Sequence, residues 1–334
     1  MAFGLDGHCV SEPGRGWARR IVAGLQFLVN HQNGLVFCIG GREASFVGQG
    51  HTVAAVAAPR FKDKPFGFLE LTIDEAGEVT VEEHRLCLPA ELGLFDYHVH
   101  TRFAYCSDGS MDFADTVRLA EMFNLKGFSF TEHSRHLYYP REALRLPVID
   151  RREENRVDEF LREVAAYRGT NILAGVELDP SFTGQPTMRA EEIERFDIVL
   201  GGVHRLPKLS FEDMYVAESN LKGMLLNFLE FPVDVLAHPL RVMWKGQSGG
   251  GHVSRDFCGW LAKYLKQKNV AAGLNFHGNN PDPQFFQICL EEGVKIALGS
   301  DAHSLCDVGS FHPHLEFLRT LGCSGDLTDV LLTR

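Results

Sequence analysis

The chain has 334 residues, of which 45% are hydrophobic and 23% are charged, and its formal net charge is −11. This composition is typical of a globular protein, and the length allows one large domain and a smaller one. No stretch of the sequence reaches the roughly 18 apolar residues of a membrane span, and its start lacks a basic-then-apolar signal pattern. We therefore expect a cytoplasmic protein without a membrane partner.

The charge and the cysteines limit the binding partners. Affinity for duplex nucleic acid comes mainly from arrayed Lys and Arg, so an acidic chain without a basic cluster is not expected to bind it. The eight cysteines are scattered without CxxC pairs, which is typical of reduced thiols rather than of a disulfide framework or a zinc finger. A small anionic substrate stays compatible with this charge if bound cations supply a local positive field.

Residues 1–93 are predicted to form a small α+β region without catalysis of its own. A helix is expected around Trp17–Leu28. Four short alternating runs follow it and predict an antiparallel layer: Leu35–Ile39, Thr52–Ala58, Phe66–Ile73 and Val79–Leu86. Pro89 and the nearby Glu91-Leu-Gly93 are the expected linker to the rest of the chain.

Residues 94–334 alternate between short apolar runs and amphipathic segments, the pattern of β/α units on a parallel sheet. The predicted strands are Leu94–Val99, Gly127–Thr131, Asn171–Glu177, Asp197–Val203, Val233–Ala237, Val270–Phe276 and Val294–Ser300. One-faced apolar stripes such as Val157, Phe160 and Val164 predict helices between them. Periodicity alone allows an open doubly wound sheet or a closed barrel. Because nearly every strand ends in His, Asp or Glu, and a barrel gathers its site from many strand ends, we predict a (β/α)7 barrel.

The polar residues at these strand ends predict a metal centre. Alternation along the first strand puts His98 and His100 on one face, where both imidazoles can reach one ion. An HxH pair alone is weak evidence, because it also occurs as ordinary packing. Seven further candidates follow at later strand ends or in the loops just after them: Asp108, His133, Glu177, His204, His238, Asp301 and His303. Unrelated core histidines are not expected to track strand ends so regularly.

The chemistry of these donors limits the choice of metal. Imidazole and carboxylate without thiolate favour Zn, Mn or Fe over Ca or Mg alone. At about three or four protein donors per ion, the candidate set predicts two or three divalent cations, with Glu177 bridging a pair.

Seven short motifs, HVHT, SDG, TEH, GVE, GGVH, AHP and GSDAH, occur in this order over roughly residues 94–312. In this run the chain resembles the PHP (polymerase and histidinol phosphatase) family of metal-dependent phosphoesterases. The resemblance implies a distorted seven-stranded β/α barrel with three metal ions. It implies His98, His100, Glu177 and Asp301 for the first ion, Glu177, His204 and His238 for the second, and Asp108, His133 and His303 for the third. The chain departs from the family at Glu132, where many relatives have Asp, and at Asp108, which is a His in some branches.

The expected reaction is hydrolysis of a phosphoester by metal-activated water, so no side-chain nucleophile is required. The candidate catalytic residues are Asp301, His303 and Glu177, with Asp301 or a neighbouring histidine moving the proton. Three arginines near predicted ligands are candidates either for gripping a phosphate or for surface salt bridges: Arg135, Arg205 and Arg241.

Several functions fit such a centre. A small phosphomonoester, as for histidinol phosphatases, is the favoured substrate. A phosphodiesterase or exonuclease for nucleotides or short nucleic acid is the alternative, although the acidic chain disfavours a polymer. Amidohydrolase barrels also begin with HxH and end with Asp, but many bridge their metals with a carbamylated lysine, and this chain has no lysine between Lys126 and Lys208. A non-enzymatic remnant should have lost ligands, yet every candidate position is filled.

The first ninety residues resemble the closing strands of calcineurin-like metallophosphoesterases. The resemblance runs from Gly40-Gly41 through Pro65-Phe-Gly-Phe-Leu to Glu82–Leu86, and it lacks the metal motifs of that family. We expect this region to be an appendage for packing or for forming a homo-oligomer.

Overall fold

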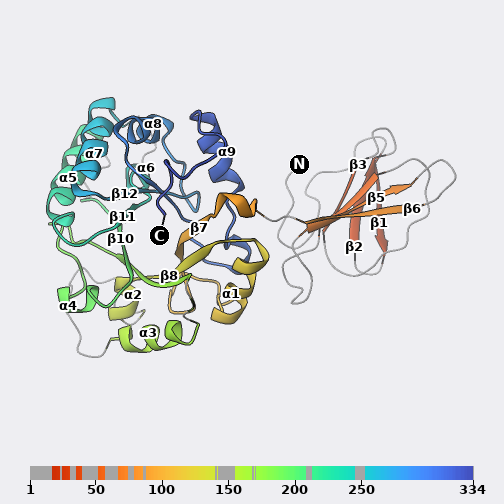
Figure 1. Ribbon diagram of the computed structural model, residues 1–334, viewed down its shortest axis with the longest axis horizontal. Coiled ribbons are helices and arrows are strands. Elements are labelled where there is room, and N and C mark those ends of the chain that lie inside the picture. Colours follow the sequence, from red (N-terminus) through yellow and green to blue (C-terminus); the bar gives the residue numbers. More distant parts are fainter. Residues whose placement is uncertain are drawn as a thin grey trace. The chain divides into compact units, whose positions relative to one another are not determined.

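The structure is a computed structural model, and the chain divides into two compact units, Met1–Leu88 and Pro89–Arg334 (Figure 1). It describes residues 17–22, 25–30, 35–39, 52–56, 67–73, 79–85, 88–139, 141, 155–167, 169, 171–207, 213–244 and 253–333. None of the helices in these ranges is long and apolar enough to cross a membrane.

The described residues of the first unit form one six-stranded sheet. Its strands lie in chain order: β1 (Trp17–Val22), β2 (Leu25–Asn30), β3 (Leu35–Ile39), β4 (Thr52–Val56), β5 (Gly67–Ile73) and β6 (Val79–Arg85). Strands β3 and β4 pair in parallel, and the other neighbours pair antiparallel. The expected layer is therefore antiparallel except at this one pair.

The helix predicted around Trp17–Leu28 is wrong. This segment forms β1 and β2, which pair antiparallel from Trp17 opposite Asn30 to Val22 opposite Leu25. Only two residues separate the paired strands, the spacing of a tight hairpin. The segment is rich in β-branched and aromatic residues, so its apolar positions fit a pleated strand as well as a helix. The hydrogen bonds of β1 with β2 and of β2 with β3 favour strands over a helix in this segment.

The second unit is built around seven parallel strands in a nearly closed barrel (Figure 1). They are β7 (Phe95–Val99), β8 (Gly127–His133), β9 (Ile172–Leu178), β10 (Ile198–Gly202), β11 (Val235–Ala237), β12 (Ala271–Leu274) and β13 (Ile296–Leu298). Each strand pairs with its neighbour in the sequence. The predicted seven-stranded β/α barrel is confirmed.

Helices follow the strands, and the longer ones lie around the outside of the barrel (Figure 1). The described helices are α1 (Phe113–Met122), α2 (Ser134–Tyr138), α3 (Val157–Ala165), α4 (Ala190–Ile193), α5 (Met214–Phe228), α6 (Arg241–Trp244), α7 (Arg255–Lys268), α8 (Pro283–Glu292) and α9 (His312–Thr320). Side chains of Asp112, Asp213, Ser254 and Asp282 cap the N-termini of α1, α5, α7 and α8. In α3, Val157, Phe160 and Val164 are buried, as their spacing predicts.

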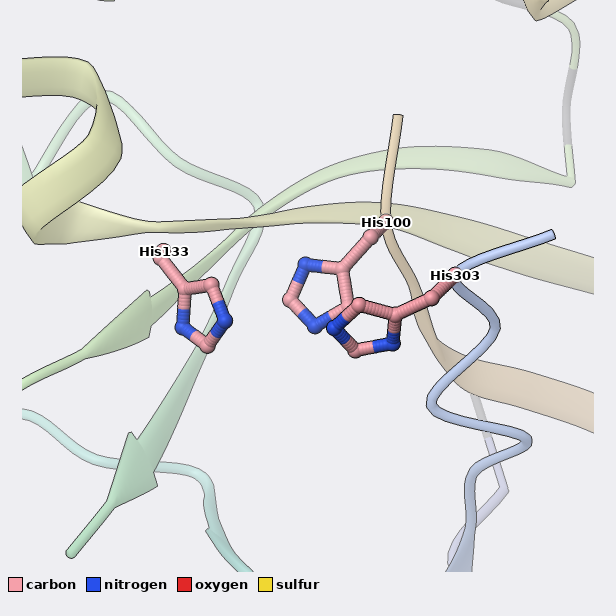
Figure 2. Close-up of side chains that lie close together, drawn as sticks. All are labelled: His100, His133 and His303. Atoms are coloured by element: carbon pink, nitrogen blue, oxygen red, sulfur yellow. The ribbon is translucent and has the colours of Figure 1, made fainter. Parts of the chain in front are cut away.

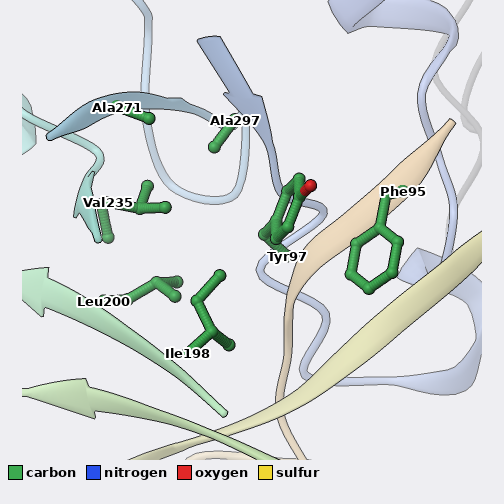
Figure 3. Packing of buried hydrophobic residues seen from close by; sticks show 8 residues of the cluster. Phe95, Tyr97, Ile198, Leu200, Val235, Ala271 and Ala297 are labelled. Atoms are coloured by element: carbon green, nitrogen blue, oxygen red, sulfur yellow. The ribbon is translucent and has the colours of Figure 1, made fainter. Parts of the chain in front are cut away.

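Apolar side chains fill the interior of the barrel. Tyr97 of β7, Ile198 and Leu200 of β10, Val235 of β11 and Ala297 of β13 point toward one another (Figure 3). The Tyr97 hydroxyl donates to the Leu332 carbonyl, 3.1 Å away. The interior is thus a packed core, and polar groups gather at the carboxyl ends of the strands.

The barrel closes between β7 and the segment after β13. The amide of Asp301 donates to the His98 carbonyl at 2.8 Å, and the amide of His100 donates to the Ala302 carbonyl at 3.1 Å. The buried Asp96 carboxylate reinforces this seam by accepting the Ser300 amide at 2.9 Å. These contacts join segments about 200 positions apart in the sequence.

Candidate metal centre

The carboxylate of Glu177, at the end of β9, lies at the middle of a ring of histidines. The side chain is fully buried. Its Oε1 lies 2.8 Å from His238 Nε2 and 3.3 Å from His204 Nε2. Its Oε2 lies 2.8 Å from His133 Nδ1, 3.4 Å from His98 Nε2 and 3.8 Å from His100 Nε2. Each oxygen therefore faces a separate group of imidazoles.

A glycine on the neighbouring strand makes room for this carboxylate. Gly202 ends β10, and a Cβ at this position would lie 2.2 Å from Glu177 Oε1. Any side chain here would collide with a buried charged group. The second glycine of the Gly201-Gly202 pair is therefore required to leave space for the Glu177 carboxylate.

The HxH pair converges as its alternation predicts. The Nε2 atoms of His98 and His100 are 3.1 Å apart. Both approach Asp301 Oδ1, at 3.5 Å and 3.0 Å respectively. All three side chains are buried. Several donor atoms directed at one small volume are the arrangement expected of ligands that share a cation.

A second convergence brings together His100, His133 and His303 from three elements (Figure 2). One ring nitrogen from each lies within 4.8 Å of the others. Asp108, the expected partner of this group, is not part of it. Its amide donates to the His303 carbonyl at 3.0 Å, but its exposed carboxylate accepts from the amide and hydroxyl of Ser110. Its role as a ligand stays a prediction.

Three buried atoms of the centre lack the hydrogen bonds that buried polar atoms normally make: Glu177 Oε2, His204 Nε2 and His238 Nδ1. Glu177 Oε2 makes none of acceptable geometry, although His133 Nδ1 is 2.8 Å away, and His204 Nε2 likewise has no partner. Close approach without hydrogen bonding is what a carboxylate and imidazoles show when a cation belongs between them. In the described part of the chain, four sets of donors could hold an ion. Three consist of predicted ligands: His98, His100 and Glu177; His133, Glu177 and His204; His100, His133 and His303. The fourth joins His133 to Cys106 and His136. The donors present therefore fit divalent metals.

Further carboxylates orient the histidines from behind. Glu132 Oε1 lies 3.3 Å from His100 Nδ1, and its Oε2 accepts the Thr101 hydroxyl at 2.6 Å. Asp179 Oδ1 lies 2.9 Å from His204 Nδ1. A carboxylate on the far nitrogen fixes the tautomer and ring direction of a metal-binding histidine. From the sequence alone, Glu132 stands out only as a departure from the family, and Asp179, two residues beyond Glu177, is not predicted.

The electrostatics favour positive charge at the centre. Burial alone raises the pKa of Glu177, but the facing His204, His133 and His98 hold it well below its usual range. For Asp301, burial is likewise outweighed by His98, His100 and Arg241, and its pKa is well below normal. Both carboxylates therefore stay ionised at neutral pH.

The three candidate arginines do not gather at one point. Arg241 is buried, donates from Nη1 to Asp301 Oδ2 at 2.7 Å, and places Nη2 2.7 Å from His238 Nε2. Arg205 is exposed. Arg135 is half-buried on α2, with its amide 3.3 Å from Asp179 Oδ2. Arg241 thus contacts the predicted ligands themselves, and phosphate binding by any of the three stays a prediction.

The fold and the centre together define a seven-stranded β/α barrel with clustered histidines and carboxylates at its strand ends. The family model for the PHP domain matches residues 96–277, more than half of the chain. The chain belongs to the PHP domain family. The match lies within the second unit, so the calcineurin-like resemblance of the first ninety residues is untested, and Gly40, Gly41 and Pro65 lie outside the described residues.

Relatives and a solved structure agree with this assignment. Two proteins named "Probable phosphatase", from Thermoanaerobacter sp. (strain X514) and Thermoanaerobacter pseudethanolicus (strain ATCC 33223 / 39E), are each 29% identical over 170 residues. The matched region is 48% of this chain and 66% of each relative, so the chain spans just under two thirds of their length. The crystal structure of the "putative histidinol phosphatase" of Listeria monocytogenes matches with a TM-score of 0.50 at 14% identity, covering 66% of this chain and 99% of that one. This likeness shows the fold.

Proposed function

We propose that the chain is a phosphoesterase that hydrolyses a small phosphomonoester with two or three divalent cations. The observation that carries the proposal is the Glu177 carboxylate, whose two oxygens face different groups of histidines. With one oxygen toward each group of imidazoles, Glu177 would help to hold two cations, as carboxylates do in two-metal phosphoesterase sites. The names of the Thermoanaerobacter and Listeria proteins support phosphatase chemistry.

The cations would be zinc, manganese or iron, held by the nine ligands predicted above. When bound, they lower the pKa of water and offset the negative charge of the phosphoryl oxygens.

Within the chain, Asp301 directs Oδ1 at His98 and His100. His303 Nδ1 lies 2.7 Å from the Asp301 carbonyl, so this nitrogen carries the proton and Nε2 keeps its lone pair. His303 Nε2 is therefore the atom through which this residue would bind a cation or accept a proton.

The acidic balance of the chain favours a small substrate over a nucleic acid polymer. The size class of the substrate and the type of ester are open to direct measurement. We expect the full chain, supplied with Mn²⁺ or Zn²⁺, to hydrolyse members of a phosphomonoester panel, including histidinol phosphate, faster than bis(p-nitrophenyl) phosphate or short oligonucleotides. Faster cleavage of the diesters would show that the protein is a phosphodiesterase rather than a phosphatase.

The role of Glu177 is tested by Glu177→Gln. The amide keeps the shape of the side chain but loses the charge that holds two cations, so turnover should fall by more than the roughly 10- to 100-fold typical of residues that only orient ligands. The measurement is kcat with bound metal counted in parallel. His312→Ala, an exposed histidine on α9, is the matched control. Full turnover and full metal content in Glu177→Gln would exclude the proposed centre.

A further inference from the structure

We propose that His277, in the loop after β12, is a positioning residue of the metal centre. Its ring stacks on the ring of the predicted ligand His303 and fixes the direction in which His303 presents Nε2 to a cation. The inference rests on the metal dependence proposed above, and it adds no ligand to the nine already predicted.

The strand β12 is the one strand of the barrel whose end delivers none of the predicted ligands. The loop that follows it nevertheless lies against the centre. Asn275 Nδ2 donates to Asp301 Oδ2 at 3.2 Å, and Asn279 Nδ2 donates to the Asn275 carbonyl at 3.1 Å. The His277 carbonyl accepts from Arg241 Nη1 at 3.3 Å. The backbone that carries the His277 ring is therefore tied to the groups around Asp301.

The rings of His277 and His303 lie nearly parallel, with centroids 4.3 Å apart and an angle of 12° between their planes. The rings of His100 and His133 meet His303 at the steeper angles of 54° and 56°. At its edge, His303 Nδ1 donates to the Asp301 carbonyl at 2.7 Å. His303 is only half-buried, so this hydrogen bond alone would leave its ring free to tilt. The hydrogen bond fixes the tautomer, and the stack fixes the plane of the ring.

His277 acts through His303 rather than as a ligand. Among the residues that the structure describes, none of the donor sets that could hold an ion includes His277. Coordination of a cation draws electron density out of the His303 ring, and an electron-poor ring attracts the negative face of a neighbouring ring. The stack should therefore be stronger when the ion is bound, so it contributes to metal affinity and not only to folding.

The test compares His277→Phe, which keeps an aromatic ring without ring nitrogens, with His277→Ala, which removes the ring. Zinc affinity is measured on the metal-free full chain by competition with a chelator, and kcat and KM are measured on the loaded protein. We expect His277→Ala to bind one ion roughly 10- to 100-fold more weakly, with a lower kcat and little change in KM. His277→Phe should stay close to the wild type in both affinity and kcat. Asn280→Ala, at an exposed position in the same loop, is the matched control.

A double-mutant cycle shows whether His277 acts through His303. Removing the His277 ring should weaken zinc binding in the wild type but have no further effect in His303→Ala, because the partner ring is already gone. Circular dichroism of each variant checks that the chain remains folded. An equal loss of affinity in both backgrounds would mean that His277 acts elsewhere and would overturn the proposal.

Unchanged zinc affinity in His277→Ala would also overturn the proposal. So would a loss in His277→Phe as large as that in His277→Ala, which would show that a ring nitrogen is used, or a raised KM with unchanged affinity, which would make His277 a substrate contact. Zinc binding is measured without substrate, so the outcome is separable from the proposed function. The expected affinities in a chain that hydrolyses no phosphoester would keep this inference and reject the activity, whereas hydrolysis with equal affinities would do the reverse.

Discussion

Arg241 and Asn275 fix the way in which Asp301 presents its carboxylate. Arg241 Nη1 and Asn275 Nδ2 both donate to Oδ2, at 2.7 Å and 3.2 Å. Oδ1 is left facing His98 and His100. With one oxygen occupied by two buried donors, Asp301 offers a single oxygen to a cation. We therefore propose that Arg241 positions the predicted ligand Asp301 rather than binding phosphate.

The exchange Arg241→Lys tests this description. Lysine keeps the charge but lacks the planar fork that reaches Asp301 and His238 together. We expect roughly 10- to 100-fold weaker metal binding and a fall in kcat, with little change in KM. Metal titration and steady-state kinetics measure the two effects, and Arg255→Lys, at an exposed position on α7, is the control. A raised KM with unchanged metal binding would instead support phosphate binding by Arg241.

At the residue scale, the candidate ligands could be predicted from the sequence, whereas the groups that orient them could not. His98 and His100 were predictable because strand alternation places them on one face, and both lie in the centre. Asn275 and Asp179 were not, because their partners lie 26 and 25 positions away and only the closed barrel brings them together. For Asp108, the position near a strand end could be predicted from the sequence. The direction of its carboxylate could not, because it depends on the hydrogen bond from Ser110.

The end of β10 shows how a strand shapes the centre. A Cβ at Gly202 would lie 2.2 Å from Glu177 Oε1 and 2.8 Å from His204 Cε1. Neither group can move freely, since Glu177 is buried and His204 is held by Asp179. Gly202→Ala should therefore displace the carboxylate and lose about 1–3 kcal/mol of unfolding free energy.

Urea denaturation and metal counting measure this loss, and we expect fewer bound ions in the variant. Gly223→Ala, within α5, is the matched control because nothing lies within 4 Å of the Cβ it would add. It should stabilise the helix by about 0.5–1 kcal/mol. Normal metal content in Gly202→Ala would mean that the carboxylate can shift without harm.

At the scale of elements, the predictions are correct where the pattern of apolar residues fits only one kind of secondary structure. The buried runs at β8 and β9, separated by helical stripes, fit parallel strands and little else. The segment around Trp17–Leu28 fits both a helix and a hairpin, and the choice depended on pairing with β3, which local periodicity does not contain.

Stability of the whole chain should depend on pH through His314. This histidine of α9 is buried between Phe276 and Phe311, and its Nε2 donates to the Gly299 carbonyl at 3.0 Å. Burial lowers its pKa from 6.5 to about 4. Between these values the unfolded chain binds a proton that the folded chain does not. The unfolding free energy therefore falls as the pH drops from about 6.5 to about 4, by up to about 3 kcal/mol from this group.

The contribution of His314 is isolated by comparing variants, because other groups titrate in the same range. We expect the unfolding free energy of His314→Gln to depend less steeply on pH between about 4 and 6.5 than that of the wild type. His312→Ala, an exposed histidine on the same helix, should keep the wild-type slope. Equal slopes in all three proteins would show that His314 is not the titrating group.

The seam of the barrel affects when the centre can assemble. His98 and His100 are tied to Asp301 and Ala302 by backbone hydrogen bonds, so the earliest and latest donors of the centre meet at one place. During synthesis on the ribosome, the histidines of the first β/α unit emerge long before the segment that completes their surroundings. Metal capture at full affinity must therefore wait until nearly the whole barrel has been made. A nascent chain that stalls before this point would carry reactive but incomplete donor sets.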